Sequence, residues 1–172
     1  MDAITLLKQD HKTVEQLFKK FEKTGGRAHA AQRDIAERVV KELSVHAVIE
    51  EMVFYPTIRE YVPTVEDTVL ESLEEHHVVK WLAAEIDKMS PDHERFRAKM
   101  MVLIENVRHH VEEEETELFP EVRKAMGRKT LQELGQRLEE AKKTVPSRPR
   151  PKAPDEPPRP RARAAARAGS RG

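Results

Sequence analysis

The chain has 172 residues, with 31 Lys and Arg against 31 Asp and Glu, 8 His and no Cys. The lack of Cys excludes disulfide frameworks, Cys-ligated zinc, Cys-bound iron–sulfur clusters and thiol catalysis. Charged residues make up 36% and aromatic residues 5% of the chain, which favours helices with solvated faces over a β-sandwich or barrel. We expect a cytoplasmic protein, because the first residues hold no signal-peptide-like apolar run and no later segment approaches a membrane span.

The neutral net charge conceals two oppositely charged parts. Residues 146–172 carry eight basic and two acidic residues, a net charge of +6, whereas residues 1–145 carry 23 basic and 29 acidic residues, a net charge of −6. Seven of the 11 prolines also lie in 146–172. We therefore expect a disordered basic tail rich in Pro, Arg and Ala. Its charge suits nucleic acid or an anionic lipid, although it has no aromatic residue for base stacking; an inert solubilising tail is the alternative.

Apolar residues recur at helical spacing in four segments, and each stripe also passes through polar residues. The stripes are Ile4, Leu7, His11, Val14, Phe18 and Phe21; Ile35, Val39, His46, Glu50 and Val53; Val69, Leu73, His76, Val79, Ala83 and Ile86; and Phe96, Met100, Leu103, Val107, His110 and Glu114.

Prolines and capping residues predict where these segments begin and end. The second segment, about 30–59, is predicted to close at Pro56 and Pro63. The third is predicted to open at Thr64 and the fourth at Ser90, which precedes a first-turn proline. A short fifth helix is expected over 131–143.

Four amphipathic segments joined by short polar turns predict an all-α fold, an up-down-up-down four-helix bundle. We assign residues 1–126 to this bundle, 127–145 to a short extra C-terminal helix and 146–172 to the tail.

The bundle segments repeat in pairs. HAVIEEMVFYP at 46–56 and HVEEEETELFP at 110–120 share His, two Glu, an aromatic residue and Pro in one eleven-residue frame, offset by 64 residues. QDHKTVEQLF at 9–18 resembles EEHHVVKWLA at 74–83, with an offset of 65 residues between His11 and His76. The chain is therefore interpreted as two related helical hairpins around a pseudo-two-fold axis, which would bring four His and two Glu together.

The shared residues suit a metal site. Residues four apart lie on one face of a helix, so each helix with the HxxxE frame can hold one metal centre with an imidazole and a carboxylate. A six-donor set without sulfur suits iron or manganese, and zinc less well. Glu114 is preferred to Glu115 because it matches Glu50. The predicted ligands are His11, His46, Glu50, His76, His110 and Glu114.

The motifs DH at 10–11, HxxxEExxFYP at 46–56, EHH at 75–77 and HxxxEExxLFP at 110–120 resemble the bacterial hemerythrin-like (HHE cation-binding) proteins. The resemblance covers about residues 1–126. It implies a non-haem di-iron centre, oxo- or hydroxo-bridged, held by the six predicted ligands with Glu50 and Glu114 as bridges. The chain departs from oxygen-carrying hemerythrins at Lys80, where they have a second His, and at the fourth-helix carboxylate, which they place five residues after its His.

The missing ligand leaves about two coordination positions open, which favours chemistry with dioxygen or hydrogen peroxide in an oxidative-stress or oxygen response over simple carriage. An enzymatic form would be a catalase-like disproportionation of peroxide. The alternatives are an oxygen, nitric oxide or iron sensor or buffer whose tail contacts a partner, and a structural bundle without metal. A ferritin-like centre needs two ExxH pairs, but only Glu74 and His77 show that spacing.

Four other positions have simpler interpretations. His77 and His109 lie about 100° from the ligand face and are taken as exposed or supporting residues. Tyr55 is expected to pack in the core or at its lip, with a role as a ligand or as a hydrogen-bond donor left open. Lys80 is assigned to the polar surface of the third helix.

Overall fold

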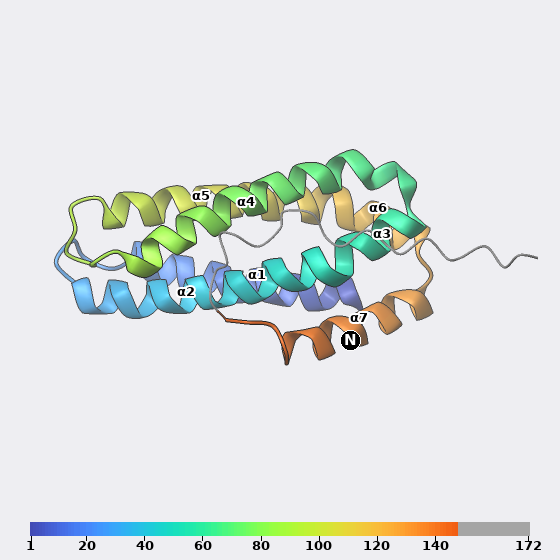
Figure 1. Cartoon of the computed structure of the whole chain (residues 1–172), viewed down its shortest axis with the longest axis horizontal. Coiled ribbons are helices and arrows are strands. Elements are labelled where there is room, and N and C mark those ends of the chain that lie inside the picture. The colour runs from blue at the N-terminus through green and yellow to red at the C-terminus, as the bar shows by residue number, and fades with distance from the viewer. Residues whose placement is uncertain (148–172) are drawn as a thin grey trace, which may run out of the picture.

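The computed structural model describes residues 1–147, and every regular element within that range is helical. Four long helices run side by side along the molecule (Figure 1): α1 (Ala3–Glu22), α2 (His29–Ile49), α4 (Glu66–Lys88) and α5 (Phe96–Glu113). A further helix, α7 (Arg128–Lys142), packs outside them against α1 and α2. The predicted all-α bundle with an extra C-terminal helix is confirmed. Most of the predicted tail, residues 148–172, lies outside the described residues.

Two of the four long helices continue through a wider turn. The π-helix η1 (Glu50–Phe54) joins α2 to α3 (Tyr55–Tyr61), and the π-helix η3 (Glu114–Leu118) joins α5 to α6 (Phe119–Ala125). The Tyr55 N–H donates to the Glu50 carbonyl, and the Phe119 N–H donates to the Glu114 carbonyl. Each π-turn therefore begins at a carboxylate of the repeated frame.

The prediction that Pro56 and Pro63 close the second helix is wrong for Pro56, whereas Pro63 does follow the end of the helical path. Pro56 lies in the first turn of α3, directly after η1, and the helical path continues to Tyr61. A proline inside an α-helix lacks its N–H and clashes with the preceding turn, and the shift from α to π hydrogen bonding relieves both problems here. Pro120 occupies the equivalent place in α6.

Two other boundaries differ from the prediction. The third helix, α4, begins at Glu66, two residues after Thr64, because a 3₁₀ helix, η2 (Pro63–Val65), precedes it. Ser90 does not cap the fourth helix. Its carbonyl accepts a hydrogen bond from the His93 N–H at 3.1 Å, which closes a turn, and α5 begins only at Phe96.

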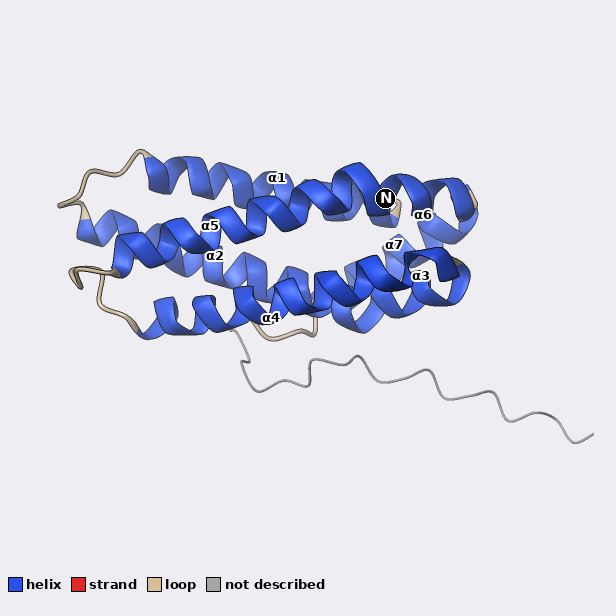
Figure 2. Ribbon diagram, turned by 90° about the horizontal axis from the view of Figure 1, so that it is seen from above, coloured by secondary structure: helices blue, strands red, loops and turns tan. Residues whose placement is uncertain are grey.

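The apolar core consists of two clusters at opposite ends of the bundle. One cluster lies near η1, η3 and α7, and the other lies among α1, α2, α4 and α5 near the two interhelical loops seen at one end in Figure 2. A buried polar layer separates them, formed mainly by His11, His46, Glu50, Glu51, His76, Lys80, His110 and Glu114. Because unpaired buried polar groups are costly, this layer requires an explanation from its chemistry.

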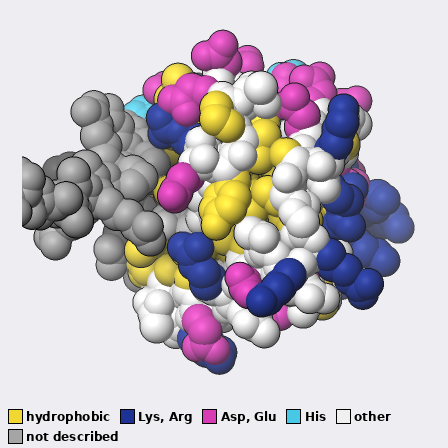
Figure 3. All heavy atoms as spheres, turned by 90° about the vertical axis from the view of Figure 1, so that its right-hand side faces the viewer, with side chains coloured by type: hydrophobic (Ala, Val, Ile, Leu, Met, Phe, Trp, Pro, Cys, Tyr) yellow, Lys and Arg dark blue, Asp and Glu magenta, His cyan; other side chains and the backbone are white. Residues whose placement is uncertain are grey.

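The outer surface is mostly polar and mixed in charge. Figure 3 views the end of the bundle near α3 and α6, where apolar side chains show between charged ones and Lys and Arg gather along one edge. Within residues 1–147, no helix combines the length and apolar character that crossing a membrane requires.

Candidate metal centre

The buried polar layer contains all six predicted ligands. His11 comes from α1, His46 from α2, His76 from α4 and His110 from α5, and all four point into the bundle axis. The two glutamates come from the first residues of the π-helices. Their exposed fractions are His11 5%, His46 6%, Glu50 0%, His76 3%, His110 4% and Glu114 1%.

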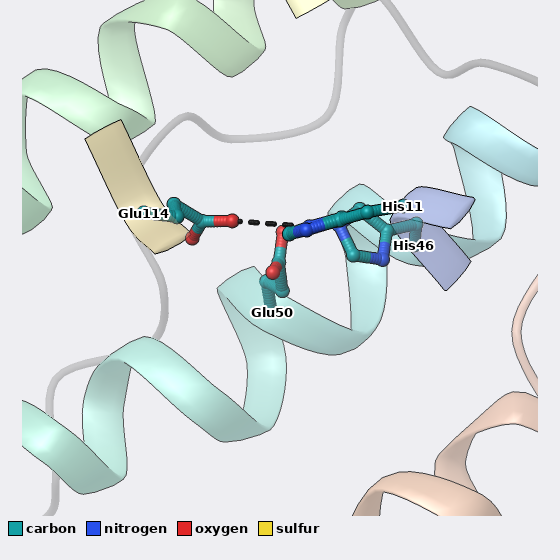
Figure 4. Close-up of side chains that lie close together, drawn as sticks. All are labelled: His11, His46, Glu50 and Glu114. Atoms are coloured by element: carbon teal, nitrogen blue, oxygen red, sulfur yellow. Dashed lines mark hydrogen bonds and ion pairs between the residues drawn. The ribbon is translucent and has the colours of Figure 1, made fainter. Parts of the chain in front are cut away.

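His11 and His46 form one half of the layer, shown with both glutamates in Figure 4. Their Nε2 atoms lie 3.1 Å apart. The His46 Nε2 is 3.1 Å from Glu50 Oε2, and the His11 Nε2 is 3.3 Å from Glu114 Oε2. We call the space between these donors the first position.

His76 and His110 repeat the arrangement in the other half. Their Nε2 atoms also lie 3.1 Å apart. The His76 Nε2 is 3.3 Å from Glu50 Oε2, and the His110 Nε2 is 3.5 Å from Glu114 Oε2. We call the space between these donors the second position. Both carboxylates therefore lie between the two histidine pairs.

A carboxylate holds the outer nitrogen of every imidazole. The Nδ1 atoms of the four histidines lie 2.7–3.4 Å from these oxygens: His11 with Glu115, His46 with Asp10, His76 with Glu51 and His110 with Glu75. An ionised carboxylate only accepts hydrogen bonds, so Nδ1 carries the proton. In the neutral imidazole, Nε2 is then left with a lone pair directed at the centre.

Three of the four carboxylate oxygens at the centre lack a hydrogen-bond donor. Glu50 Oε1, Glu50 Oε2 and Glu114 Oε2 are buried and accept no hydrogen bond. The four imidazoles cannot all donate a hydrogen bond to these oxygens, because two Nε2 atoms 3.1 Å apart cannot both carry a hydrogen toward the same space.

Metal ions fit this donor set. A cation with donors at about 2.1 Å and right angles between them spaces neighbouring donors about 3.0 Å apart, close to the separations found here. Within residues 1–147, two of the groupings of His and carboxylate atoms close enough to hold an ion are these: His11, His46, Glu50 and Glu114; and Glu50, His76 and His110.

The charges of the layer respond strongly to one another. Burial opposes the charged form of His46, but Glu50 and Asp10 outweigh it and raise the pKa of His46 to about 10. Burial also opposes the charged form of His76, and Glu50 and Glu51 raise its pKa to about 9. Despite complete burial, the same histidines hold the pKa of Glu50 well below its usual range. The carboxylates thus demand positive charge, from protons or from metal ions.

Tyr55 belongs to the centre. Its side chain is fully buried, and its hydroxyl donates a hydrogen bond of 2.9 Å to Glu114 Oε1 and lies 3.4 Å from the His76 Nε2. Burial and the neighbouring Glu114 and Glu50 raise the pKa of Tyr55 well above its ordinary value, so the phenol keeps its proton. Phe119, its counterpart in the repeat, stacks on His11 with ring centroids 5.8 Å apart.

Sequence reasoning missed the four outer carboxylates. Asp10 and Glu75 each precede a predicted ligand, and Glu51 and Glu115 each follow one, so the repeated acidic neighbours were a usable signal. The assignment of Lys80 to the surface is wrong. Lys80 is 7% exposed, and its Nζ lies 2.9 Å from Glu51 Oε1, because it neutralises the carboxylate that holds His76.

The remaining histidines lie away from the layer. His77 and His93 are exposed, and the half-buried His29 has its Nδ1 2.9 Å from the Pro91 carbonyl oxygen. His109 is also exposed, with its Nε2 3.2 Å from Glu113 Oε1 and 3.7 Å from Glu75 Oε1.

An apolar cavity of about 20 Å³ borders the four imidazoles. Its other walls are Val14, Leu43, Ala47, Val79, Val107 and Val111. An open groove of about 280 Å³ between α1 and α5 shares three of these valines and reaches His11 from outside. Only small molecules fit the inner space, since a water molecule alone requires roughly 10–15 Å³ on this kind of measure.

Comparisons with known proteins show the family and the fold. The model of the hemerythrin HHE cation binding domain family matches residues 2–122. A crystal structure of an HHE cation binding domain-containing protein from Mycobacterium kansasii has the same fold, with a TM-score of 0.69, 18% identity, and coverage of 84% of this chain and 89% of that one.

Two curated relatives match most of this chain, but the match covers a smaller share of each relative's own length. An uncharacterized hemerythrin-like protein of Schizosaccharomyces pombe is 30% identical over 120 residues, which cover 69% of this chain and 59% of that protein. A protein of Nostoc named as a DNA nickase is 25% identical over 148 residues, which cover 86% of this chain and 41% of that protein. The chain thus spans about half the length of these relatives.

Proposed function

The chain belongs to the hemerythrin HHE cation binding family, and from that premise we propose that its buried centre holds two iron ions and reacts with dioxygen or hydrogen peroxide. The observation that carries this proposal is the set of three buried carboxylate oxygens without a donor, which face four inward Nε2 atoms. Burying such groups without cations would cost several kcal/mol each, against a total domain stability of roughly 5–15 kcal/mol.

Each side chain of the layer has a distinct part in holding the ions. His11 and His46 would serve the first position, and His76 and His110 the second. Glu50 and Glu114 would bridge the two positions, since each has an oxygen close to both histidine pairs. The outer carboxylates fix the tautomer and orientation of the imidazoles and raise their basicity.

The surroundings suit a small oxidant. Bound iron supplies the electron transfer that reduction of dioxygen or turnover of peroxide requires. The apolar cavity admits a diatomic or similarly small molecule and keeps bulk water from the imidazoles. The Tyr55 hydroxyl oxygen lies 2.9 Å from Glu114 Oε1 and holds a proton beside that bridging carboxylate. An oxidative-stress or oxygen-response role follows from this reactivity.

The first test measures iron and peroxide turnover together. We expect about two irons per chain, an ultraviolet–visible spectrum with oxo- or hydroxo-bridge bands, and oxygen evolution when peroxide is added. His110→Ala should lose the second position and the turnover, whereas His109→Ala, which removes the exposed neighbouring imidazole, should keep both.

The outcomes separate the candidate functions. Bound iron with peroxide turnover supports a catalase-like enzyme, and bound iron that binds oxygen or nitric oxide without turnover supports the sensor or buffer alternative. A folded, colourless protein that takes up no metal overturns both.

A second proposal concerns residues 146–172, whose charge of +6 suits a phosphate backbone. The similarity to a protein named as a DNA nickase gives a reason to test DNA first. We expect the full chain to bind a labelled duplex with an affinity that falls steeply with salt, and residues 1–145 to lose that binding. Equal binding by both would contradict it. The cytoplasmic location stays a prediction from the sequence.

A further inference from the structure

Helix α7 lies beyond the residues that the family model matches and packs against the metal-binding part of the bundle. The family match ends at residue 122, whereas α7 runs from Arg128 to Lys142. It packs on α1, α2 and η1, the three elements that carry His11, His46 and Glu50. Its buried leucines, Leu131, Leu134 and Leu138, join the apolar cluster that contains Tyr55 and Phe119.

The last turn of α7 also makes a polar contact with the centre. The Lys142 Nζ lies 2.5 Å from Asp10 Oδ1, and Asp10 Oδ2 lies 3.4 Å from the His46 Nδ1. The Lys142 and Asp10 side chains are 29% and 17% exposed, so the ion pair is partly shielded from water. A continuous series of contacts therefore runs from α7 through Asp10 to a predicted ligand of the first position.

The other outer carboxylates have different neighbours. Glu51 is paired with Lys80 from α4, and Glu115 with Lys8 from α1 at 3.3 Å, so both cations come from the four-helix bundle. Glu75 has the exposed His109 beside it. Among these four carboxylates, Asp10 is the one whose lysine comes from α7, beyond the residues that the family model matches.

We propose that α7 is a functional part of the centre, in which Lys142 acts as a positioning residue that orients Asp10 and, through it, the His46 imidazole. The inference rests on the proposed function only in taking His46 as a ligand. Its specific consequence is unequal binding: the Lys142–Asp10 contact strengthens metal binding at the first position and leaves the second position unchanged.

The physical reason lies in how Asp10 is held. Without the lysine, a partly exposed aspartate can rotate toward water, and the 3.4 Å contact to the His46 Nδ1 is long enough to be lost easily. The imidazole would then lose the partner that fixes its tautomer, an effect that typically lowers metal affinity about 10–100-fold.

The test titrates ferrous iron into the metal-free full chain under anaerobic conditions. Lys142→Met should weaken one of the two equivalents about 10–100-fold and leave the other unchanged. Lys142→Arg should restore binding. Lys143→Met is the matched control, since the neighbouring lysine pairs only with the exposed Glu140 among the contacts found, and it should match the wild type. Two unchanged equivalents, or two equally weakened ones, would overturn the proposal.

A measurement without metal separates this inference from the proposed function. In the metal-free protein, the His46 Nδ1–H should give a slowly exchanging ¹H–¹⁵N signal that Lys142→Met broadens or removes and Lys143→Met preserves. If the wild type binds no iron, the proposed function fails. The signal then tests the link from Lys142 to His46 by itself, and its persistence in Lys142→Met overturns that link. Thermal unfolding of each variant verifies that the bundle stays folded.

Discussion

The two HxxxE frames of the centre, His46 with Glu50 and His110 with Glu114, share one plan but differ in the aromatic residue that follows the π-turn. In both frames the histidine lies in the last turn of a long helix, and a π-turn starts at the glutamate four residues later. After the π-turn the frame of Glu50 has Tyr55 and the frame of Glu114 has Phe119. The Tyr55 hydroxyl donates a hydrogen bond to Glu114 Oε1. Glu114 therefore has one oxygen without a donor, whereas Glu50 has two.

This difference teaches which features the internal repeat dictates. The repeat sets the positions of the inward Nε2 atoms, which lie 3.1 Å apart in each half. It does not set the surroundings of the bridging carboxylates or the cations behind the outer ones. The two metal positions therefore have equivalent ligands and unequal environments, and each prediction below tests one part of that contrast.

The largest expected effect is at Glu50. Because this carboxylate has both oxygens unpaired and approaches both histidine pairs, Glu50→Ala should lower iron affinity at both positions by more than about 100-fold, beyond the range for groups around the ligands. Iron content after gel filtration measures this. Glu60→Ala, an exposed carboxylate of α3, is the control. Two irons retained in Glu50→Ala would contradict the bridging role.

The stability of the metal-free protein should depend on pH in a direction set by the histidines. The folded-state pKa values of His46, about 10, and His76, about 9, exceed the unfolded value near 6.5. Their protons therefore stabilise the fold fully below about pH 6.5, and that stabilisation is lost as the pH rises through 9 to 10. Urea unfolding across this range should show a falling free energy of unfolding.

Iron should abolish that pH dependence, because metal binding requires the neutral imidazole and replaces its proton. A metal-free protein whose free energy of unfolding stays constant between pH 6.5 and 10 would show that the layer is neutralised in another way.

Gly135 tests how closely α7 must approach the first half. A Cβ at this position would lie 2.2 Å from the Met1 carbonyl oxygen, so Gly135→Ala must push α7 away from α1. We expect a loss of about 1–3 kcal/mol in the free energy of unfolding, as for other overpacked sites. Gly25→Ala, where nothing lies within 4 Å, should stay within about 0.5 kcal/mol of the wild type. Equal effects in chemical denaturation would contradict the close packing.

Tyr55→Phe removes the hydroxyl that distinguishes the aromatic residues after the two HxxxE frames. Glu114 Oε1 then loses its donor while staying buried, which should cost the metal-free protein about 1–3 kcal/mol. The iron spectrum should also shift, since both bridging carboxylates become free to bind with two oxygens. Tyr61→Phe, at a 58% exposed tyrosine, is the control for both measurements. An unchanged spectrum and stability in Tyr55→Phe would show that this hydroxyl does not distinguish the two frames.

The smallest effect is expected at His109. Its imidazole is exposed and touches Glu75 only at 3.7 Å, so His109→Ala should change the free energy of unfolding by less than about 0.5 kcal/mol. Iron content should stay at two per chain. A loss of one iron would instead assign His109 a role in the second position.

Much of the fold and the centre was predictable because both repeat along the chain. The three apolar stripes that contain His11, His76 and His110 each have helical spacing. The HxxxE frames mark the helices that continue into π-turns. Charge composition and the prolines of the frame could not reveal the π-turns themselves, since Pro56 ends a helix in most contexts. Its place inside the helical path depends on the hydrogen bond from Tyr55 to Glu50.

The outer parts of the centre were harder to predict, because they join residues far apart in the sequence. The ion pair of Lys142 with Asp10 spans 132 residues, and that of Lys80 with Glu51 spans 29. A lysine on a charged helix is normally exposed, and only the folded structure, in which Lys80 contacts Glu51, shows that it is buried. The four-residue spacing of Lys80 after His76 indicated a lost ligand, but not its new partner.

The most direct test of the dinuclear centre is anomalous diffraction at the iron edge from crystals of the iron-loaded protein. We predict two anomalous peaks, one between the His11 and His46 Nε2 atoms and one between those of His76 and His110, with the Glu50 carboxylate touching both. A single peak, or none, in a folded bundle with these side chains in place would contradict the account.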